Sequence, residues 1–414
     1  MIPDGPALRI PLPEFLADPA LRQVLAALPG LRVVGGAVRD AVAGSPVTDV
    51  DLATPLPPEG IIAALRAAGI RALPTGIEHG TITALVQGAG FEVTTLRRDI
   101  TTDGRHATVA FTDDWREDAA RRDFTINAMS MSPSGDVFDY FGGLADLQAG
   151  IVRFVGDPAT RISEDYLRIL RFFRFQARYS AKGAAPDPVS LQAIRDGVPG
   201  LAILSPERVW TELRRILAAP DPGLAIALMA ELGVLAKLLP GGNAAQLSPL
   251  IAAEAPADPL LRLAALLAGT NSNVAALAAG LRLSTADDVR LRALCEPQSL
   301  APSASDDSIR RALADTSAEI LIERLWIAQG SAPGLAGSRA EPQFLPDWAA
   351  RRARVASIPR PVFPLEGRDV LALGVSPGPR VGALLRQVRA WWLDAGCVPD
   401  ANSCRAELAR QAAG

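Results

Sequence analysis

Two aspartates lie two residues apart in the segment TDVDLAT, residues 48–54. If this segment is a strand, its side chains alternate between two faces, so Asp49 and Asp51 project from the same face with Cα atoms about 6.6 Å apart. Two converging carboxylates supply the hard oxygen ligands that Mg²⁺ binds, and pairs of such ions serve phosphoryl transfer. The alternative for an isolated Asp-x-Asp is a solvated strand edge, so the flanking sequence decides between the two interpretations.

A pair of glycines precedes the aspartates where the pattern changes from strand to helix. The run LRVV (31–34) predicts a short buried strand, and residues 37–42 predict a helix that begins directly after Gly35 and Gly36. Exposed N–H groups and the positive end of the helix dipole favour a phosphate at such a turn, and Arg39 adds charge-assisted hydrogen bonds. A plain tight turn is the alternative, but the nearby acids favour a triphosphate site beside metal ligands.

The segments that follow carry more polar candidates. Residues 91–97 (FEVTTLR) predict a strand with Glu92 in its interior, where an acid is unusual unless it is solvated or functional. A third carboxylate of a metal site would come from such a neighbouring strand. Residues 99–106 (DITTDGRH) predict a mobile loop that carries Asp103 and Arg105. It is either an ordinary surface loop or one that orders over a nucleotide.

Residues 118–129 predict a helix that is half-buried against a sheet, with Arg122, Asp123 and Asn127 among its apolar positions. Buried polar groups must be hydrogen-bonded, so these three form either a structural network or nucleotide contacts. The rest of the first third predicts a small mixed sheet. Its expected strands are residues 70–73, 81–86, 137–141 and 151–154, and its expected helices are residues 57–68 and 142–148.

Residues 161–178 predict a single long helix with one polar stripe. The stripe consists of residues at steps of three or four, namely Glu164, Arg168, Arg171, Arg174 and Arg178. From residue 161 to residue 182 there are six basic side chains against two acidic ones. Asp165 and Arg168 are three residues apart, which places them on one face of this helix. The alternative is a solvated amphipathic helix with ordinary ion pairs.

The whole chain bounds the remaining possibilities. Its 414 residues exceed one domain, and abundant alanine and leucine with few aromatic residues favour helices. The sequence contains no run of about 18 apolar residues and does not begin like a signal peptide, so we expect a protein without membrane contact. Three cysteines without metal-ligand spacing favour a reducing, cytoplasmic setting. The net charge is −3, so any nucleic acid would have to bind to local basic patches. The chain has only two histidines, which excludes a histidine-rich zinc site.

In order along the chain, these motifs resemble the bacterial-type (class II) tRNA nucleotidyltransferases, the CCA-adding enzymes, whose sister group is the bacterial poly(A) polymerases. The matching stretches are GGAVRD (35–40), DVDLAT (49–54), HGTITALV (79–86), FEVTTLR (91–97), TTDGRHATVAFTDDW (101–115), RRDFTINAM (121–129), FDYFGGLADL (138–147) and RISEDYLRILRFFRF (161–175). Each stretch alone is a modest signal, whereas the ordered set is specific.

The resemblance implies an α+β fold, in which a polymerase-beta-like nucleotidyltransferase head, a small mixed sheet with helices, is followed by an all-helical neck, body and tail. The expected divisions are an N-terminal lead-in (1–26), the catalytic head (27–155), the neck with its nucleotide-selecting motif (156–218), the body (219–340) and a tRNA-binding tail (341–414). Most of the chemistry is therefore expected in the first half of the chain.

The resemblance also implies roles for residues. Asp49 and Asp51 would bind two Mg²⁺ ions, with Glu92 as a third carboxylate. Gly35, Gly36 and Arg39 would hold the triphosphate. The expected nucleotide contacts are Arg122, Asp123, Asn127, Arg161, Asp165, Arg168 and Arg171, and the flexible loop would contribute Asp103 and Arg105.

In this family the acid and the arginine that match Asp165 and Arg168 act as a protein template. They hydrogen-bond the Watson–Crick edge of CTP or ATP. C and A carry an amine where U and G carry a carbonyl, so a carboxylate accepts from the first two bases and faces an acceptor in the others. A site built on such hydrogen bonds discriminates strongly.

The resemblance therefore implies template-independent addition of CCA to the tRNA 3′ end from CTP and ATP, with release of pyrophosphate. The expected partners are the acceptor arm of tRNA and the two nucleotides, and no oligomeric state follows. A poly(A) polymerase, a CC-only or A-only enzyme and an inactive RNA-binding protein remain alternatives. The segments HGTITALV and TTDGRHA favour CCA addition, the loop with Asp103 and Arg105 argues against a CC-only enzyme, and intact Asp49, Asp51 and Glu92 argue against an inactive protein.

Overall fold

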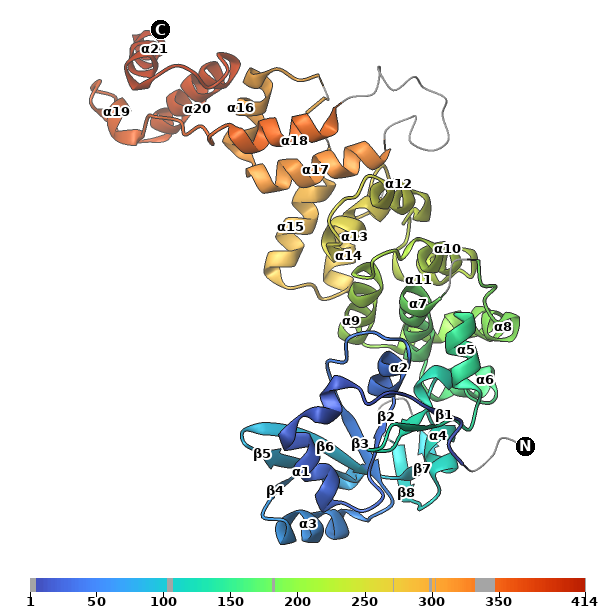
Figure 1. Cartoon of the computed structure of the whole chain (residues 1–414). Helices are drawn as coiled ribbons and strands as arrows, with labels where there is room; N and C mark the ends of the chain where they lie inside the picture. The colour runs from blue at the N-terminus through green and yellow to red at the C-terminus, as the bar shows by residue number, and fades with distance from the viewer. Residues whose placement is uncertain are drawn as a thin grey trace. The chain divides into compact units, whose positions relative to one another are not determined.

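The computed structural model of the chain describes residues 5–102, 107–180, 183–270, 272–297, 300–301, 303–331 and 347–413. The chain divides into two compact units, Met1–Leu238 and Leu239–Gly414 (Figure 1). All described strands lie in the first unit, which confirms the expected mixed-sheet head followed by helices. No helix among the described residues is long and apolar enough to cross a membrane.

The head is built on a mixed sheet, which has eight strands within the described residues. In spatial order they are β1 (Leu8–Arg9), β10 (Asp136–Phe138), β9 (Ser130–Met131), β2 (Arg32–Val34), β3 (Asp51–Thr54), β6 (Ala89–Thr95), β5 (Thr81–Val86) and β4 (Arg71–Gly76). Strands β3 and β6 are parallel, while β2 and β3 are antiparallel with Val34 opposite Asp51. Strands β7 (Arg97–Thr102) and β8 (Ala107–Phe111) form a separate pair.

One face of this sheet is covered by helices α1 (Pro19–Ala27) and α3 (Pro58–Ala67), as Figure 1 shows. Apolar residues at helical spacing on α3, such as Ile61 and Leu65, pack with strand residues such as Ile82 and Val93, and all four are completely buried. Leu52 belongs to the same core. Since side chains alternate along a strand, Asp51 points to the opposite face of the sheet.

The neck follows the head within the first unit. Its helices are α6 (Pro158–Glu164), α7 (Leu167–Tyr179), α8 (Pro188–Gly197) and α9 (Pro206–Leu217). Helices α10 (Gly223–Glu231) and α11 (Val234–Leu238) follow it and complete the first unit. Buried aromatic rings join α7 to the head: Phe124 lies 4.7 Å from Phe154 and 5.2 Å from Phe175, and Phe154 stacks on Phe172 at 6.0 Å between ring centroids. Aromatic pairs of this kind stabilise a junction beyond their buried area, so α7 is held firmly against the head.

The prediction of a single long helix over residues 161–178 is wrong. Helix α6 ends at Glu164, Asp165 is extended with φ −158° and ψ 106°, and α7 begins at Leu167. The Asp165 side chain accepts the Leu167 N–H at 3.1 Å, which stabilises a new helix start. Asp165 therefore does not share a helix face with Arg168, and the predicted polar stripe is divided between two helices.

Four predictions in the head are also wrong in part. Residues 118–129 are not one helix, because α4 (Trp115–Ala120) ends early and a 3-10 turn, η3 (Thr125–Asn127), follows. The Asp123 side chain accepts the Phe124 N–H, and Phe124 pairs with Phe154 as an isolated bridge, which replaces the expected strand 151–154.

The expected loop over 99–106 is a strand as far as Thr102, since β7 pairs with β8, while Asp103, Arg105 and His106 lie outside the described residues. The Asp-x-Asp segment is only half in a strand, because β3 begins at Asp51. The alternating-face argument therefore does not apply to Asp49.

The second unit is helical throughout its described part. Its α-helices are α12 (Leu247–Ala252), α13 (Pro259–Leu267), α14 (Val274–Gly280), α15 (Thr285–Cys295), α16 (Asp306–Asp315), α17 (Ala318–Ser331), α18 (Trp348–Ser357), α19 (Gly367–Leu371), α20 (Pro379–Asp394) and α21 (Ala401–Ala413). One core joins α16, α17 and α18 through residues such as Leu325, and another joins α19, α20 and α21 around Trp392. All three cysteines are free thiols.

Candidate functional site

A cleft of about 1180 Å³ lies within the first unit, between the head and the neck. Its head side is formed by the glycine turn, the Asp-x-Asp segment and the residues around η3, and its neck side by α7 and α9. Its charged lining consists of arginines and aspartates, namely Arg39, Arg122, Arg168, Arg171, Arg174, Arg178, Arg208 and Arg215 with Asp40, Asp49, Asp51, Asp123, Asp165 and Asp221. Cations for phosphates and carboxylates for a metal or a base amine thus occur in one cavity.

The register of the sheet brings the Asp-x-Asp segment to the glycine turn. Val34, the last residue of β2, pairs with Asp51, the first residue of β3, so Gly35 follows at the same edge. Asp49 and Asp51 are both exposed, and neither has an ion-pair partner among the described residues. Two unpaired carboxylates at a cleft are chemically suited to Mg²⁺, because that ion prefers oxygen ligands and retains some of its waters.

Glu92 lies on the strand next to the aspartates but does not line the cleft. Leu52 pairs with Val93 in the parallel register, so the preceding residues, Asp51 and Glu92, are neighbours on adjoining strands and share a face. Glu92 is exposed. In the part of the chain that the structure describes, no three acidic, histidine or cysteine side chains converge into a metal cluster.

The turn before α2 (Gly36–Val42) requires a glycine at its first position. Gly35 has φ +69°, and a Cβ there would lie 2.8 Å from Nη1 of Arg122. The Arg122 guanidinium therefore packs directly against this glycine, and both Gly35 and Gly36 line the cleft.

Arg39 is buried beneath that turn, with 7% of its surface exposed. Its Nε and Nη2 donate to the two carboxylate oxygens of Asp40, each at 3.0 Å, and its Nη1 donates to Oδ1 of Asn127 at 2.6 Å. The Asn127 amide then donates to Oδ1 of Asp123 at 3.0 Å. The polar residues of two separate motifs thus form one continuous buried network.

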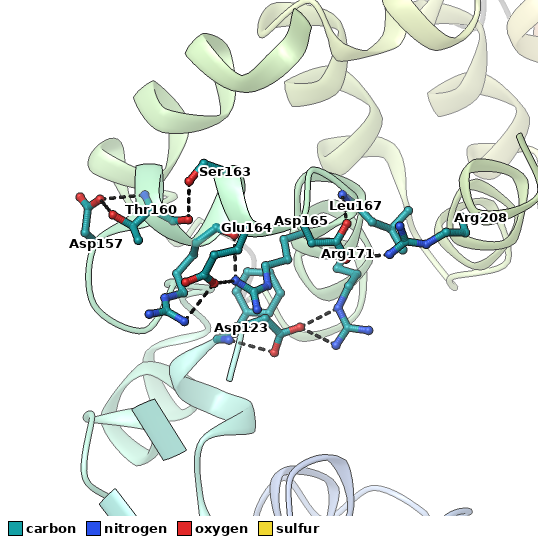
Figure 2. Close-up of polar contacts among 12 residues, drawn as sticks. Asp123, Asp157, Thr160, Ser163, Glu164, Asp165, Leu167, Arg171 and Arg208 are labelled. Atoms are coloured by element: carbon teal, nitrogen blue, oxygen red, sulfur yellow. Dashed lines mark hydrogen bonds and ion pairs between the residues drawn. The ribbon is translucent and has the colours of Figure 1, made fainter. Parts of the chain in front are cut away.

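Asp123 links this network to the neck. Its Oδ2 accepts from Nε of Arg171 at 2.6 Å, and its Oδ1 also accepts the Phe124 N–H at 2.9 Å (Figure 2). Burial raises the pKa of Asp123. The charge of Arg171 and the hydrogen bonds from Asn127, Arg171 and Phe124 lower the pKa by more than burial raises it, so the net shift is downward. The carboxylate therefore stays ionised and holds Arg171 in the cleft.

Asp118, in α4, is a second buried aspartate with a lowered pKa. Burial raises its pKa, but the charges of Arg121 and Arg122 and hydrogen bonds from Arg121 and the Arg97 N–H bring the pKa below its ordinary value. Nη2 of Arg122 lies 3.3 Å from Oδ2 of Asp118. Asp118 therefore positions Arg122 at the cleft.

These lowered pKa values predict a dependence of stability on pH. A carboxyl group whose pKa is lower in the folded state stabilises the protein above its unfolded pKa, and this contribution disappears as the pH falls through the folded pKa. We expect the free energy of unfolding to fall steeply below about pH 3.8, the ordinary aspartate value, and less steeply in Asp118→Asn. That variant should also lose roughly 1–3 kcal/mol at pH 7, because hydrogen bonds to a buried charge are weakened.

Urea denaturation between pH 7 and pH 3 measures both effects. Asp196→Asn is the control, since Asp196 is an exposed residue of α8 whose carboxylate, among the residues that the structure describes, accepts only from the Gln192 amide. Identical slopes for wild type and Asp118→Asn would contradict the assignment.

On the neck side of the cleft, Asp165 and Arg168 are each held by different neighbouring residues. Nη2 of Arg208, on α9, donates to Oδ2 of Asp165 at 2.7 Å, while Oδ1 accepts the Leu167 N–H (Figure 2). Arg168 pairs with Glu164 and donates through Nη1 to the carbonyl oxygen of Arg161 at 2.8 Å. The acid and the arginine are therefore oriented separately before any ligand arrives.

The structure brings most of the predicted residues together. Those that line the cleft are Gly35, Gly36, Arg39, Asp49, Asp51, Arg122, Asp123, Asn127, Asp165, Arg168 and Arg171. Arg161 and Glu92 do not line it, and Arg161 instead pairs with Glu164 at 3.0 Å. Arg208 was not among the predicted site residues, and its only signal in the sequence was its place just after the Ser-Pro helix start at residues 205–206.

Comparisons with known proteins support these observations. A family model described as the poly(A) polymerase head domain matches residues 31–153, and one described as the probable RNA and SrmB-binding site of polymerase A matches residues 185–246. The mitochondrial CCA tRNA nucleotidyltransferase 1 of Danio rerio is 38% identical, over 87% of this chain and 83% of that protein. The CCA-adding enzyme of Lacticaseibacillus paracasei is 32% identical over 91% of each chain.

Solved structures of CCA-adding enzymes have a similar fold. The Bacillus stearothermophilus CCA-adding enzyme in complex with CTP matches with a TM-score of 0.72 and 25% identity, over 96% of this chain and 98% of that one. The Thermotoga maritima CCA-adding enzyme complexed with tRNA matches with a TM-score of 0.66 at 18% identity, over 97% of this chain and 98% of that one, which concerns the fold alone.

Proposed function

This chain belongs to the CCA tRNA nucleotidyltransferase family, and from that premise we propose that it adds C, C and A to the 3′ end of tRNA, using CTP and ATP and releasing pyrophosphate. The observation that carries the proposal is that one cleft is lined by the exposed carboxylates, the glycine turn and the oriented acid and arginine of the neck. The relatives' names and the CTP complex of the Bacillus stearothermophilus enzyme support it.

We assign two Mg²⁺ ions to Asp49 and Asp51, with Glu92 as an assisting carboxylate on the neighbouring strand. The support is the donor set, which consists of exposed oxygen ligands that no cation of the described chain neutralises. When bound, the ions supply Lewis-acid activation of the primer 3′-OH and stabilise the departing pyrophosphate.

We assign the triphosphate to Gly35, Gly36 and Arg39. Three of the five guanidinium N–H groups of Arg39 are used by Asp40 and Asn127, which leaves two for phosphate oxygens. An ideal Cβ on Gly36 would lie 3.5 Å from Nη2 of Arg39, so the guanidinium lies directly against the turn. This proximity supports a shared phosphate site.

We assign the ribose and the remaining nucleotide contacts to Arg122, Asp123, Asn127 and Arg171. Asp103 and Arg105, which lie outside the described residues, are proposed to close over the nucleotide. Arg161 is proposed to act through Glu164, since Glu164 holds Arg168.

Base selection is assigned to Asp165 and Arg168. A carboxylate has about four lone-pair positions, and Asp165 uses one for Leu167 and one for Arg208, so it can still accept from the amine of C or A. Arg168 uses only Nη1 for partners among the described residues, so Nε and Nη2 can donate to ring nitrogen or carbonyl acceptors. Each group is oriented and still has hydrogen-bonding capacity for the base.

Arg208 is then a positioning residue, and its replacement should alter base choice. In Arg208→Gln, Asp165 loses its charged partner and rotates more freely, so we expect the preference for CTP over UTP to fall roughly tenfold. Single-nucleotide incorporation with each triphosphate in turn measures that ratio. Arg195→Gln, on the exposed side of α8, is the control, and an unchanged ratio in Arg208→Gln contradicts the role.

The proposed reaction is tested with tRNA that ends at its discriminator base. CTP alone should give two additions, ATP alone should give none, and both together should give three. A long tail of A with ATP alone would indicate a poly(A) polymerase, a stop after two with both nucleotides a CC-adding enzyme, and no addition an RNA-binding protein.

The divisions into head (27–155), neck (156–218), body (219–340) and tRNA-binding tail (341–414), after the lead-in (1–26), remain proposals about function. A cytoplasmic location is also proposed, on the ground that all three cysteines are free thiols, as a reducing compartment maintains. The Danio rerio relative is named as mitochondrial, so cell fractionation is the test.

A further inference from the structure

Tyr179, the last residue of α7, contacts the buried network under the glycine turn. Its hydroxyl donates to Oδ1 of Asp40 at 2.5 Å, and the Arg39 guanidinium carbon lies 4.4 Å from the centre of its ring. Asp40 is 139 residues away in sequence, and both it and Arg39 line the cleft. The end of the neck helix therefore touches the proposed triphosphate group through two separate interactions.

The pairing of Arg39 with Asp40 needs such a third group. Adjacent side chains on a helix point about 100° apart and do not face each other, so a two-pronged contact between neighbours is not the default on α2. Here both carboxylate oxygens of Asp40 accept from Arg39, at 3.0 Å each, and Oδ1 also accepts from Tyr179. The hydroxyl holds the carboxylate in the orientation that receives the arginine.

Arg39 is thereby fixed on several sides. Asp40 holds Nε and Nη2, Asn127 holds Nη1, and the rings of Tyr179 and Phe175 lie against the guanidinium at 4.4 and 5.0 Å. The two remaining N–H groups are left for phosphate oxygens, and an added Cβ on Gly36 would lie only 3.5 Å from Nη2, so the guanidinium lies against the turn. A guanidinium held in this way loses little side-chain entropy when it meets an anion.

We propose that Tyr179 is a positioning residue for the triphosphate of the incoming nucleotide, and that it acts by orienting Asp40 and Arg39, whichever base the nucleotide carries. This inference rests on the proposed function for the identity of the ligand. It adds a residue of the neck to phosphate binding, which the head motifs otherwise explain alone.

The chemistry of the phenol agrees with this role. Burial, and then the hydrogen bond to Asp40, raise the pKa of Tyr179 to about 12. The hydroxyl thus keeps its proton at neutral pH and remains the donor, with the carboxylate as acceptor. Loss of the oxygen alone would leave the ring contact with Arg39 in place, so Tyr179→Phe isolates the hydrogen bond.

The test uses the full chain with the substitution Tyr179→Phe. The matched control is Tyr140→Phe, because the Tyr140 hydroxyl accepts from Arg32 at 3.4 Å and lies outside the cleft. The first measurement is the dissociation constant for inorganic tripolyphosphate with Mg²⁺, by calorimetry. The second is kcat and KM for CTP on tRNA that ends at the discriminator base, and for ATP on tRNA that ends in CC.

We expect Tyr179→Phe to weaken tripolyphosphate binding roughly tenfold, and to raise KM for CTP and for ATP by a similar factor, since a charge-assisted hydrogen bond is lost. The value of kcat and the choice between C and A should stay close to wild type, and Tyr140→Phe should change neither constant. Unchanged tripolyphosphate binding in Tyr179→Phe, with or without a lower melting temperature, overturns the inference. Failure of the wild type to extend tRNA would instead contradict the proposed function, and the tripolyphosphate result would still decide the role of Tyr179.

Discussion

Asp51→Asn and Asp49→Asn are each expected to reduce kcat for nucleotide addition by roughly three orders of magnitude or more, while the protein stays folded. An amide oxygen is neutral and binds Mg²⁺ weakly, so each substitution removes a charged ligand from the proposed metal site. Both aspartates are exposed and neither forms an ion pair within the described residues, so the free energy of unfolding should change by less than about 0.5 kcal/mol.

Three measurements separate chemistry from folding for these variants. Single-turnover addition of CMP to tRNA gives the rate, thermal unfolding gives the stability, and Asp196→Asn gives the background effect of the same substitution on an exposed helix. Glu92→Gln should have a smaller effect than either variant, because Glu92 neighbours Asp51 across β3 and β6 but does not line the cleft. Activity within tenfold of wild type in Asp51→Asn would remove the basis of the metal assignment.

Asp165→Asn is expected to change which base is added. The asparagine amide still offers an oxygen, but it also offers donors that match the carbonyl of U or G. We therefore expect the catalytic efficiency with CTP and ATP to fall roughly a hundredfold and addition of UMP to become measurable, so the ratio of CTP to UTP efficiency should fall by more than about two orders of magnitude. Competition between labelled CTP and UTP on the same tRNA measures that ratio.

The control for Asp165→Asn is Asp157→Asn, in the same helix pair. Asp157 caps α6 by accepting the Thr160 N–H at 2.8 Å, and asparagine is an equally good cap, so this variant should resemble wild type. Equal loss of rate with all four triphosphates in Asp165→Asn would assign Asp165 to the local fold around Arg208 and not to base selection.

The sequence predicted the head side of the cleft well, because its signals are local. The strand, the two glycines and the helix of residues 31–42 are adjacent in the chain, and the short connection to Asp51 leaves the antiparallel pairing of β2 with β3 as a natural outcome. The positive φ of Gly35 is likewise a property of one position.

The neck was harder to predict, because side-chain capping overrides helical periodicity. Residues 161–178 have an amphipathic pattern throughout, yet Asp165 interrupts the helix by binding the N–H group two residues later. The extended Asp165 contacts Arg208 and lines the cleft.

Long-range partners gave no signal in the sequence. Arg208 is 43 residues from Asp165, and Tyr179 is 139 residues from Asp40, and no spacing rule connects either pair. The Tyr179 contact depends on how α7 packs on the head, through rings such as Phe124 and Phe172, and the Arg208 contact depends on how α9 packs on α7. The predicted roles of Asp103 and Arg105 stay predictions, since these residues lie outside the described part of the chain.

The most direct test of the account is the sequence of the product made when the wild-type protein receives all four nucleoside triphosphates together. With tRNA that ends at its discriminator base, Mg²⁺ and equal concentrations of the four, mass spectrometry of the extended 3′ end should show C, C and A, and no further nucleotide. Such a product requires both the chemistry assigned to Asp49 and Asp51 and the selection assigned to Asp165 and Arg168. A tail of A residues, a stop after two nucleotides or frequent U and G in the product would contradict it.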